Sequence, residues 1–144
     1  MPDPRDDLLK LDNQLCFALV TAARNVVSVY RPILEPLGLT HPQYLVMLAL
    51  WERAPLSLGE LARALALEPA TASPLVKRLE AQGLVRRERR DADERRLDIR
   101  LTDAGAALRE RALDVPGQVM ARTGMSPDEL AALRDALRDF AGGR

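Results

Sequence analysis

The sequence predicts a mainly α fold with one small β-hairpin, and three observations support this fold class. Leu and Ala are abundant and aromatic residues make up only 3% of the chain, a composition that favours helices over sheets. Thr40, Ser57 and Ser126 are each followed three residues later by Gln or Glu, which is the pattern of a capping box at a helix N-terminus. Residues 97–101 alternate between apolar and polar side chains, which is the period of a strand.

A long amphipathic helix is expected first, because apolar residues recur at helical spacing through residues 15–33. It starts at residue 7 or at residue 12, the latter with Asp12 as its cap, and runs to about residue 30. Pro32 is expected to end or kink it, since proline disfavours helical backbone in the residue before it. Three further helices are expected from Thr40 to about residue 51, from Ser57, and from the break at residues 67–69 to about residue 82. Two more are expected from Thr102 to about residue 113 and from Pro127 to about residue 140, and Pro116 and Gly117 interrupt the helical pattern between them.

Two short helices around a tight turn, followed by a two-stranded hairpin, are typical of a winged helix-turn-helix. Residues 40–102 are expected to form this unit. Its second helix starts between Pro69 and Pro74, because a proline inside the helix removes a backbone hydrogen bond. The hairpin closes around the charged turn at residues 91–95.

The helices that flank this unit are too many and too long for a bare DNA-binding domain. We expect the helices at residues 7–38 and 103–144 to pair two chains, and a two-fold homodimer is the commonest arrangement. Residues 1–144 are thus expected to form a single unit with a DNA-binding part and a dimerisation part.

The positive charge is concentrated in the middle of the chain, although 21 basic and 21 acidic residues give a net charge of zero. Residues 71–100 hold 9 basic and 6 acidic groups, whereas residues 1–70 hold 6 and 8. A neutral protein can still place a basic stripe where it meets phosphates. Charge alone also fits a solvated charged hairpin, but the helix-turn-helix directly before it favours binding to double-stranded operator DNA.

A recognition helix offers short polar groups to base edges and cations to phosphates. A guanidinium at the tip of a thin wing can enter the minor groove, and Asp93 is spaced to orient Arg95 there. The arginines that flank the wing are expected to contact phosphates. The residues expected at the DNA are Thr71, Ser73, Lys77, Arg78, Arg86, Arg90, Asp93, Arg95 and Arg96.

Several classes of protein are excluded by composition. One Cys and one His cannot supply the four ligands of a structural zinc site, so no metal is expected. A single Cys also forms no intrachain disulfide, which fits a reducing cytosol, and neither a signal peptide nor a membrane-spanning apolar run is found. We therefore expect a cytoplasmic protein. Because the chain has no P-loop, nucleophile elbow, dinucleotide fingerprint or zinc-protease motif, we also expect that it is not an enzyme and carries no cofactor.

The motifs around the expected wing resemble the MarR family of bacterial repressors, and the resemblance covers nearly the whole chain. They are Leu79-Glu80, Gly83-Leu84-Val85, Asp93-Glu94-Arg95-Arg96 and Leu101-Thr102. Within the family, four further segments are similar to the organic hydroperoxide sensors, the OhrR branch. They are residues 11–19 (LDNQLCFAL), 30–32 (YRP), 42–47 (PQYLVM) and 50–52 (LWE).

This resemblance implies an obligate dimer that represses a peroxidase gene and releases DNA when an N-terminal Cys is oxidised by an organic hydroperoxide. Cys16, the only thiol, is then the redox residue. Tyr30 follows 14 residues later, about 21 Å along a straight helix, so it reaches only the Cys16 of a second chain. The branch uses a Tyr in this way to donate to the thiol, and the family's wing Asp and Arg correspond to Asp93 and Arg95.

Three positions depart from the branch. Val20 and His41 stand where relatives have tyrosine, and Ala121 lies near the position of the second Cys of two-cysteine relatives. His41 either donates a hydrogen bond at the redox site or is simply a polar residue in the first turn of a helix. Oxidised Cys16 needs a low-molecular-weight thiol for its reduction, or it progresses to higher acids.

Other interpretations stay open. Phe17 and Trp51 either line an apolar pocket or belong to the core. The protein is alternatively a MarR-type repressor released by a small aromatic or phenolic ligand, with Cys16 as a structural apolar residue. It is also open whether the chain binds DNA as an architectural protein without sequence preference.

Overall fold

The structure is a computed structural model that describes residues 1–90 and 93–140, with side chains other than those of residues 90–95. Its 3-10 helices are η1 (Pro4–Leu9), η2 (Leu11–Asn13) and η3 (Glu35–Leu37). Its α-helices are α1 (Leu15–Leu34), α2 (His41–Arg53), α3 (Leu58–Ala64), α4 (Pro69–Ala81), α5 (Asp103–Ala112), α6 (Val115–Thr123) and α7 (Pro127–Phe140). The strands β1 (Leu56–Ser57), β2 (Val85–Arg90) and β3 (Asp93–Leu101) form one antiparallel sheet in the order β1-β3-β2.

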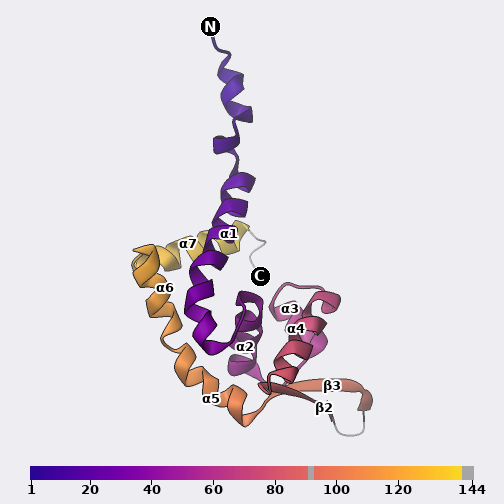
Figure 1. The fold of residues 1–144 in the computed structure, drawn as a ribbon. Coiled ribbons are helices and arrows are strands. Elements are labelled where there is room, and N and C mark those ends of the chain that lie inside the picture. The colour runs from indigo at the N-terminus through magenta and orange to yellow at the C-terminus, as the bar shows by residue number, and fades with distance from the viewer. Residues whose placement is uncertain (91–92, 141–144) are drawn as a thin grey trace.

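The fold is a winged helix-turn-helix with long helical extensions, as the sequence predicts. Helices α2, α3 and α4 pack together beside the hairpin of β2 and β3 (Figure 1). Helices α5, α6 and α7 lead back from the hairpin along one side of the molecule, and α1 packs against α6. The N-terminal segment with η1 and η2, together with the N-terminal part of α1, projects away from the rest of the chain (Figure 1). We call this projection the arm. Among the described residues, no helix has the length and apolar character needed to cross a membrane.

One hydrophobic core joins the C-terminal end of α1 to the helix-turn-helix. Its fully buried members come from α1, α2, α3, α4, α6 and the sheet, and include Leu34, Met47, Leu61, Leu79 and Ile99. Burial of these side chains supplies most of the stabilisation, at roughly 1.5–3 kcal/mol for each large apolar residue. The core thus fixes the position of α4 relative to the end of α1.

The predicted capping boxes are confirmed at Thr40 and Ser57. The hydroxyl of Thr40 accepts from the N–H of Gln43 at 3.3 Å, and the Gln43 side chain accepts from the N–H of Thr40 at 3.0 Å. Ser57 and Glu60 form the same reciprocal pair at 3.1 and 3.3 Å. These bonds satisfy N–H groups that have no partner within the helix, so α2 and α3 begin at defined residues.

The predicted start of the first helix is wrong. Helix α1 begins at Leu15, later than residue 7 or residue 12, and Gln14 occupies the N-cap without a capping bond from its side chain. Lys10 has extended backbone and separates η1 from η2. Gln14 is also extended and separates η2 from α1. The Gln14 amide donates to the carbonyl oxygens of Leu8 and Lys10 at 2.9 and 2.8 Å, so a side chain takes the place of helical hydrogen bonds in this segment.

Prolines end helices less strictly than expected. Pro32 lies within α1, which continues two residues beyond it to Leu34, so the proline does not end the helix before itself. Pro74 likewise lies within α4, which begins at Pro69, so the open start of this helix is resolved in favour of Pro69. Pro116 does not interrupt the chain but lies in the first turn of α6, a position that proline favours.

The sheet has one strand more than the predicted hairpin. Leu56 and Ser57 form β1, which pairs with β3 in the register Leu56 to Ile99 and Ser57 to Asp98. A strand of two residues is too short to show alternation in the sequence, and only the approach of β3 reveals it. This strand connects the wing directly to the N-terminus of α3.

Candidate functional site

Helix α4 presents a polar and basic face to solvent. Thr71, Lys77 and Arg78 are exposed, and among the described residues Lys77 and Arg78 have no carboxylate partner. Ser73 differs from them, because it is half-buried and lines a small cavity of about 60 Å³ beside Arg87 and Leu97 of the wing. The face that can meet DNA therefore holds three of the four residues that the sequence predicts on this helix.

The wing arginines are mostly opposed by carboxylates of the same chain. Arg86 donates to Glu88 Oε1 at 2.6 Å, and Arg100 Nε lies 3.0 Å from the other oxygen of Glu88. Arg96 donates to Glu60 of α3 at 3.2 Å. These pairs are partly exposed, where an ion pair contributes roughly 0–1 kcal/mol, so a phosphate can replace the carboxylate at small cost.

A further ion pair joins the wing to the recognition helix. Arg87 of β2 donates to Glu80 of α4 through Nη2 at 2.9 Å and through Nε at 3.4 Å. Hydrogen bonding from Arg87 lowers the pKa of the Glu80 carboxyl below its ordinary value. The sequence analysis missed this pair, since two residues seven positions apart across a turn give no local signal.

The predicted wing-tip site lies outside the described side chains. Arg90, Asp93 and Arg95 belong to β2 and β3, which pair antiparallel with an irregularity between Arg89 and Arg90. Their roles at the DNA remain predictions.

The thiol lies on the projecting arm. Cys16 is the second residue of α1 and is exposed. At this position it lies in the first turn of the helix. Tyr30 lies on the same helix, about 21 Å further along its axis, so the two side chains do not meet within one chain.

Tyr30 belongs to an aromatic cluster at the junction of α1 and α2. Its ring centroid lies 5.0 Å from that of His41 and 5.8 Å from that of Tyr44. Burial raises the pKa of Tyr30 and lowers the pKa of His41, because both neutral forms are favoured away from water. Burial also raises the pKa of Tyr44, with a smaller contribution from charge on Tyr30. The cluster therefore holds a neutral phenol at the base of the arm.

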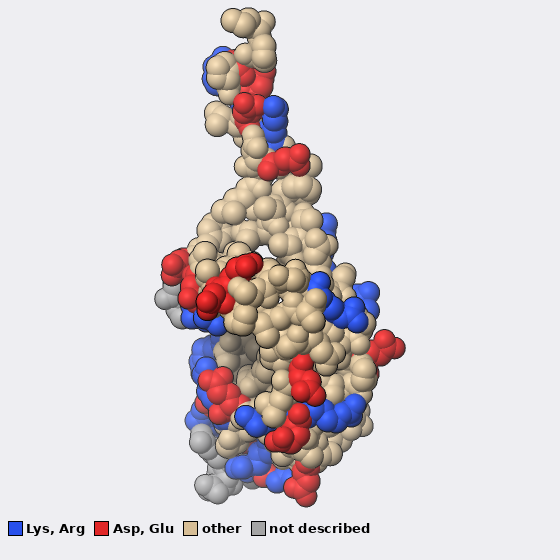
Figure 2. Space-filling view, turned by 90° about the vertical axis from the view of Figure 1, so that its left-hand side faces the viewer, with Lys and Arg blue, Asp and Glu red and all other residues tan. Residues whose placement is uncertain are grey.

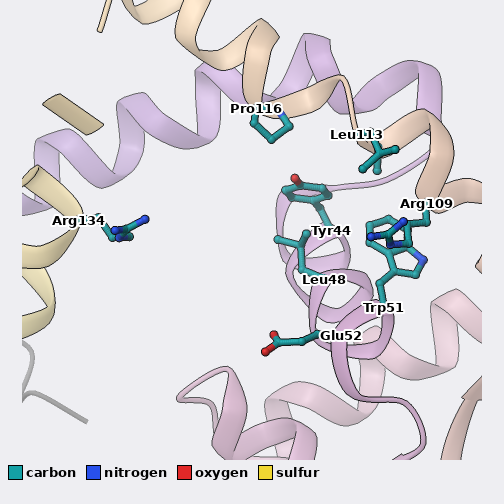
Figure 3. Close-up of a pocket in the computed structure, with 9 residues that line it drawn as sticks. Tyr44, Leu48, Trp51, Glu52, Arg109, Leu113, Pro116 and Arg134 are labelled. Carbon is teal, nitrogen blue, oxygen red and sulfur yellow. The ribbon is translucent and has the colours of Figure 1, made fainter. Parts of the chain in front are cut away.

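A cavity of about 820 Å³ lies between α2 and the C-terminal helices. Tyr44, Leu48, Trp51 and Glu52 line it from α2, and Arg134 of α7 faces them from the opposite side (Figure 3). Its remaining lining residues are Arg109, Ala112, Leu113 and Pro116. Trp51 lines this cavity and also packs against the core, whereas Phe17 is exposed on the arm and is not among the lining residues.

Two glutamines that the sequence analysis did not assign to the site connect these regions. Gln43 is buried, with 5% of its surface exposed, and its amide donates to Oε1 of Gln82 at 3.0 Å. Gln82 follows α4 and donates to the carbonyl oxygen of Gly38 at 2.7 Å. The capping box drew attention to Gln43, but no sequence pattern predicts the contact with Gln82 across 39 positions.

Comparisons with known proteins agree with this geometry. Residues 39–97 match the MarR family. The organic hydroperoxide resistance transcriptional regulator of Bacillus subtilis (strain 168) is 42% identical over 131 residues, which cover 91% of this chain and 89% of that protein.

Two solved structures have the same fold over almost the whole chain. A structure of reduced AbfR bound to DNA matches with a TM-score of 0.77 and 34% identity, covering 95% of this chain and 96% of that one. A structure of Bordetella bronchiseptica BpsR, whose DNA binding is regulated by 6-hydroxynicotinic acid, matches with a TM-score of 0.82 and 27% identity, covering 92% and 96%. The first structure is of a protein in its reduced form on DNA, whereas the second concerns regulation of DNA binding by a small aromatic acid.

Proposed function

The chain belongs to the MarR family of transcriptional regulators, and we propose that it is a homodimeric repressor whose Cys16 senses organic hydroperoxides. In this proposal residues 40–102 bind double-stranded operator DNA, and residues 7–38 and 103–144 hold two chains together. The observation that carries it is an uncharged stripe along α1 that includes both Cys16 and Tyr30.

The stripe follows the spacing of a coiled-coil seam. Cys16, Val20, Ala23, Val27 and Tyr30 succeed one another at intervals of four and three residues on α1. All but Tyr30 are exposed, and no charged residue occurs from residue 13 to residue 23. Figure 2 shows this uncharged stretch as the neck between the charged tip of the arm and the mixed charges of the body. An apolar helical face of this length needs a partner in water.

A second copy of the same helix fits this stripe. If two α1 helices cross antiparallel on a two-fold axis at Ala23, residues seven positions before it face residues seven positions after it. Cys16 then faces Tyr30 of the partner subunit, and a small side chain occupies the crossing point. The proposed dimer thus has two equivalent thiol sites across one interface, each with a phenol donor.

The proposed chemistry is oxidation of the thiolate by two electrons. The sulfur of Cys16 attacks the terminal oxygen of a hydroperoxide, the O–O bond breaks, and Cys16 becomes a sulfenic acid. The other oxygen leaves as an alkoxide and takes a proton from water. Tyr30 of the partner subunit, which burial keeps protonated, supplies a hydrogen bond to the reacting sulfur. Reduction then requires a low-molecular-weight thiol, because Cys16 is the only Cys in the chain.

The DNA face supports an operator-binding role. Each head offers Thr71, Lys77 and Arg78 on α4 and the partly neutralised arginines of the wing. A two-fold dimer presents two such heads to two half-sites. Oxidation across the shared interface changes the relative position of both heads at once, which is how a single added oxygen atom releases DNA.

The proposal is tested with Cys16→Ser. A duplex selected from a random library with the reduced wild-type protein serves as the operator, and binding is measured before and after cumene hydroperoxide. We expect the wild-type protein to lose binding as the Cys16 peptide gains oxygen, and the variant to bind in both conditions. Release of the wild-type protein without a change in mass at Cys16 would contradict redox sensing.

The cavity favours a second candidate function, release by a small aromatic anion. Its volume of about 820 Å³ is typical of ligand sites, and Tyr44, Trp51 and Arg109 combine aromatic surface with positive charge. In this case 6-hydroxynicotinic acid or salicylate would weaken operator binding by wild-type protein and Cys16→Ser equally. Such a result, with no effect of hydroperoxide, would replace the redox proposal by the ligand proposal.

A further inference from the structure

Three hydrogen bonds in series run from the turn after α1 to Gln82 at the end of α4 and back to the same turn. The N–H of Thr40 donates to Oε1 of Gln43 at 3.0 Å, and Nε2 of Gln43 donates to Oε1 of Gln82 at 3.0 Å. Nε2 of Gln82 then donates to the carbonyl oxygen of Gly38 at 2.7 Å. Gln82 is far in the sequence from the other members, so these bonds link the turn after α1 to the end of the recognition helix through space.

Both ends of this series, Thr40 and Gly38, lie in the turn between α1 and α2. Gly38 closes the turn after α1 in a left-handed conformation, with φ of 73°. The N–H of Leu39 donates to the carbonyl oxygen of Leu34, the last residue of α1, at 3.3 Å. A displacement of the end of α1 is therefore passed to the carbonyl group of Gly38.

The middle of the series, Gln82, is fixed to the recognition helix. Gln82 is the C-cap of α4, and its N–H donates to the carbonyl oxygen of Arg78 at 3.0 Å. Arg78 lies on the exposed face that we assign to DNA. Apolar contacts between α2 and α4 tolerate small sliding movements, whereas a hydrogen bond requires both distance and direction.

The two amides have only one favourable orientation. Each uses its oxygen as an acceptor and its nitrogen as a donor, so turning either amide over would place two donors or two acceptors together. Gln43 is 5% exposed, so water does not readily replace a lost partner there. This series of hydrogen bonds thus has a defined geometry that resists gradual deformation.

We propose that Gln82 is a positioning residue that transmits a shift of α1 to the recognition helix. The proposal rests on the proposed function, since it names the route by which oxidation at Cys16 reaches α4. Gln82 does not touch DNA or the thiol in this proposal. It acts through its hydrogen bond to Gly38, so its loss reduces the response to oxidant more than it reduces DNA binding itself.

The test compares full-length variants by one ratio, the operator Kd of the oxidised protein divided by that of the reduced protein. The probe is the duplex selected with the reduced wild-type protein, and the oxidant is cumene hydroperoxide. For Gln82→Met we expect this ratio to fall about fivefold relative to wild-type, which is the effect of one typical hydrogen bond. A general loss of stability would change both Kd values and leave the ratio unaltered.

Two further variants test the two hydrogen bonds of the Gln82 side chain separately. Gln82→Lys keeps a donor for the carbonyl oxygen of Gly38, and Gln82→Glu keeps only an acceptor for Gln43. We expect the lysine variant to retain more of the wild-type ratio than the glutamate variant. Gln118→Met is the matched control, because among the described residues the Gln118 side chain makes no hydrogen bond, and its ratio should equal that of wild-type.

The outcomes distinguish this inference from the proposed function. If the wild-type protein itself does not respond to the oxidant, both fail together. If it responds and Gln82→Met responds equally, or if the control falls as much as Gln82→Met, the role of Gln82 is overturned while redox sensing stands.

Discussion

The indole N–H of Trp51 donates a hydrogen bond of 2.9 Å to the carbonyl oxygen of Gly105, and this bond fixes α5 against α2. Gly105 is buried, and its backbone packs directly on that of Leu84 at the start of the wing. A Cβ atom at position 105 would overlap the carbonyl oxygen of Leu84. The close approach explains a glycine inside a helix, where this residue otherwise lowers stability. It also ties the wing to the C-terminal helices, which we propose to take part in dimerisation.

Gly105→Ala should destabilise the fold, because the added methyl group forces α5 and the wing apart. We expect the free energy of unfolding in urea to fall by about 1–3 kcal/mol, as for overpacked sites in general. Gly117→Ala in α6 is the matched control, since a Cβ there meets nothing within 4 Å. The control should gain roughly 0.5–1 kcal/mol from better helix propensity. Equal effects of the two substitutions would contradict the packing argument.

Ala23→Arg should prevent dimerisation, because a long charged side chain cannot be placed where two α1 helices cross. We expect sedimentation velocity to show a monomer and operator binding to be lost. Ala18→Arg makes the same change about 140° away around the helix, on the basis of 100° per residue, and should leave the dimer intact. A dimeric Ala23→Arg protein would exclude a crossing at this residue.

Tyr30→Phe should slow oxidation of Cys16 while leaving the fold unchanged. The ring still packs on His41 and Tyr44, but the donor to the reacting sulfur is lost. A hydrogen bond to a charged group contributes about 1.5–3 kcal/mol, so the rate should fall about tenfold or more. The rate is measured by mass spectrometry of the Cys16 peptide under limiting cumene hydroperoxide. Tyr44→Phe, which also keeps its ring, should oxidise at the wild-type rate.

His41 should make stability depend on pH between neutrality and moderate acidity. Burial lowers the pKa of His41 below its ordinary value of 6.5, so the unfolded chain takes up a proton before the folded one does. The free energy of unfolding therefore decreases as pH falls below about 6.5, until the pH reaches the pKa of the folded state. The loss is small because the ring is only half-buried.

The measurement is urea unfolding between pH 5 and pH 8 for wild-type protein and for His41→Tyr. Tyr carries a ring of related shape and does not titrate in this range. The difference between the two proteins should grow towards low pH. A difference that is constant over the whole range would show that His41 has the same pKa in both states.

The sequence predicts local structure well where a short segment contains all the interactions that form it. Thr40 with Gln43 and Ser57 with Glu60 are pairs three residues apart, and each helix begins where its pair indicates. Alternation in residues 97–101 similarly predicts β3, although the structure buries Asp98 together with Ile99 and leaves Leu97 exposed.

The errors arise where a distant or side-chain interaction decides the outcome. Helix α1 starts at Leu15 because the Gln14 amide binds carbonyl groups of the preceding segment. Strand β1 exists because β3 lies beside Leu56. The sequence assigns no carboxylate partner to Arg96. In the structure Arg96 donates to Glu60, which lies 36 positions earlier. None of these contacts has a periodic signal.

By itself, then, the sequence determined the winged helix-turn-helix and the placement of Cys16 and Tyr30 on one N-terminal helix, because helical periodicity, capping and strand alternation are properties of neighbouring residues. Only the tertiary structure decided that this helix projects as an arm with an exposed uncharged stripe, and that Gln43 and Gln82 connect its end to the recognition helix. The physical reason is that packing and hydrogen bonding join residues by their positions in space, and these positions are set by the whole core.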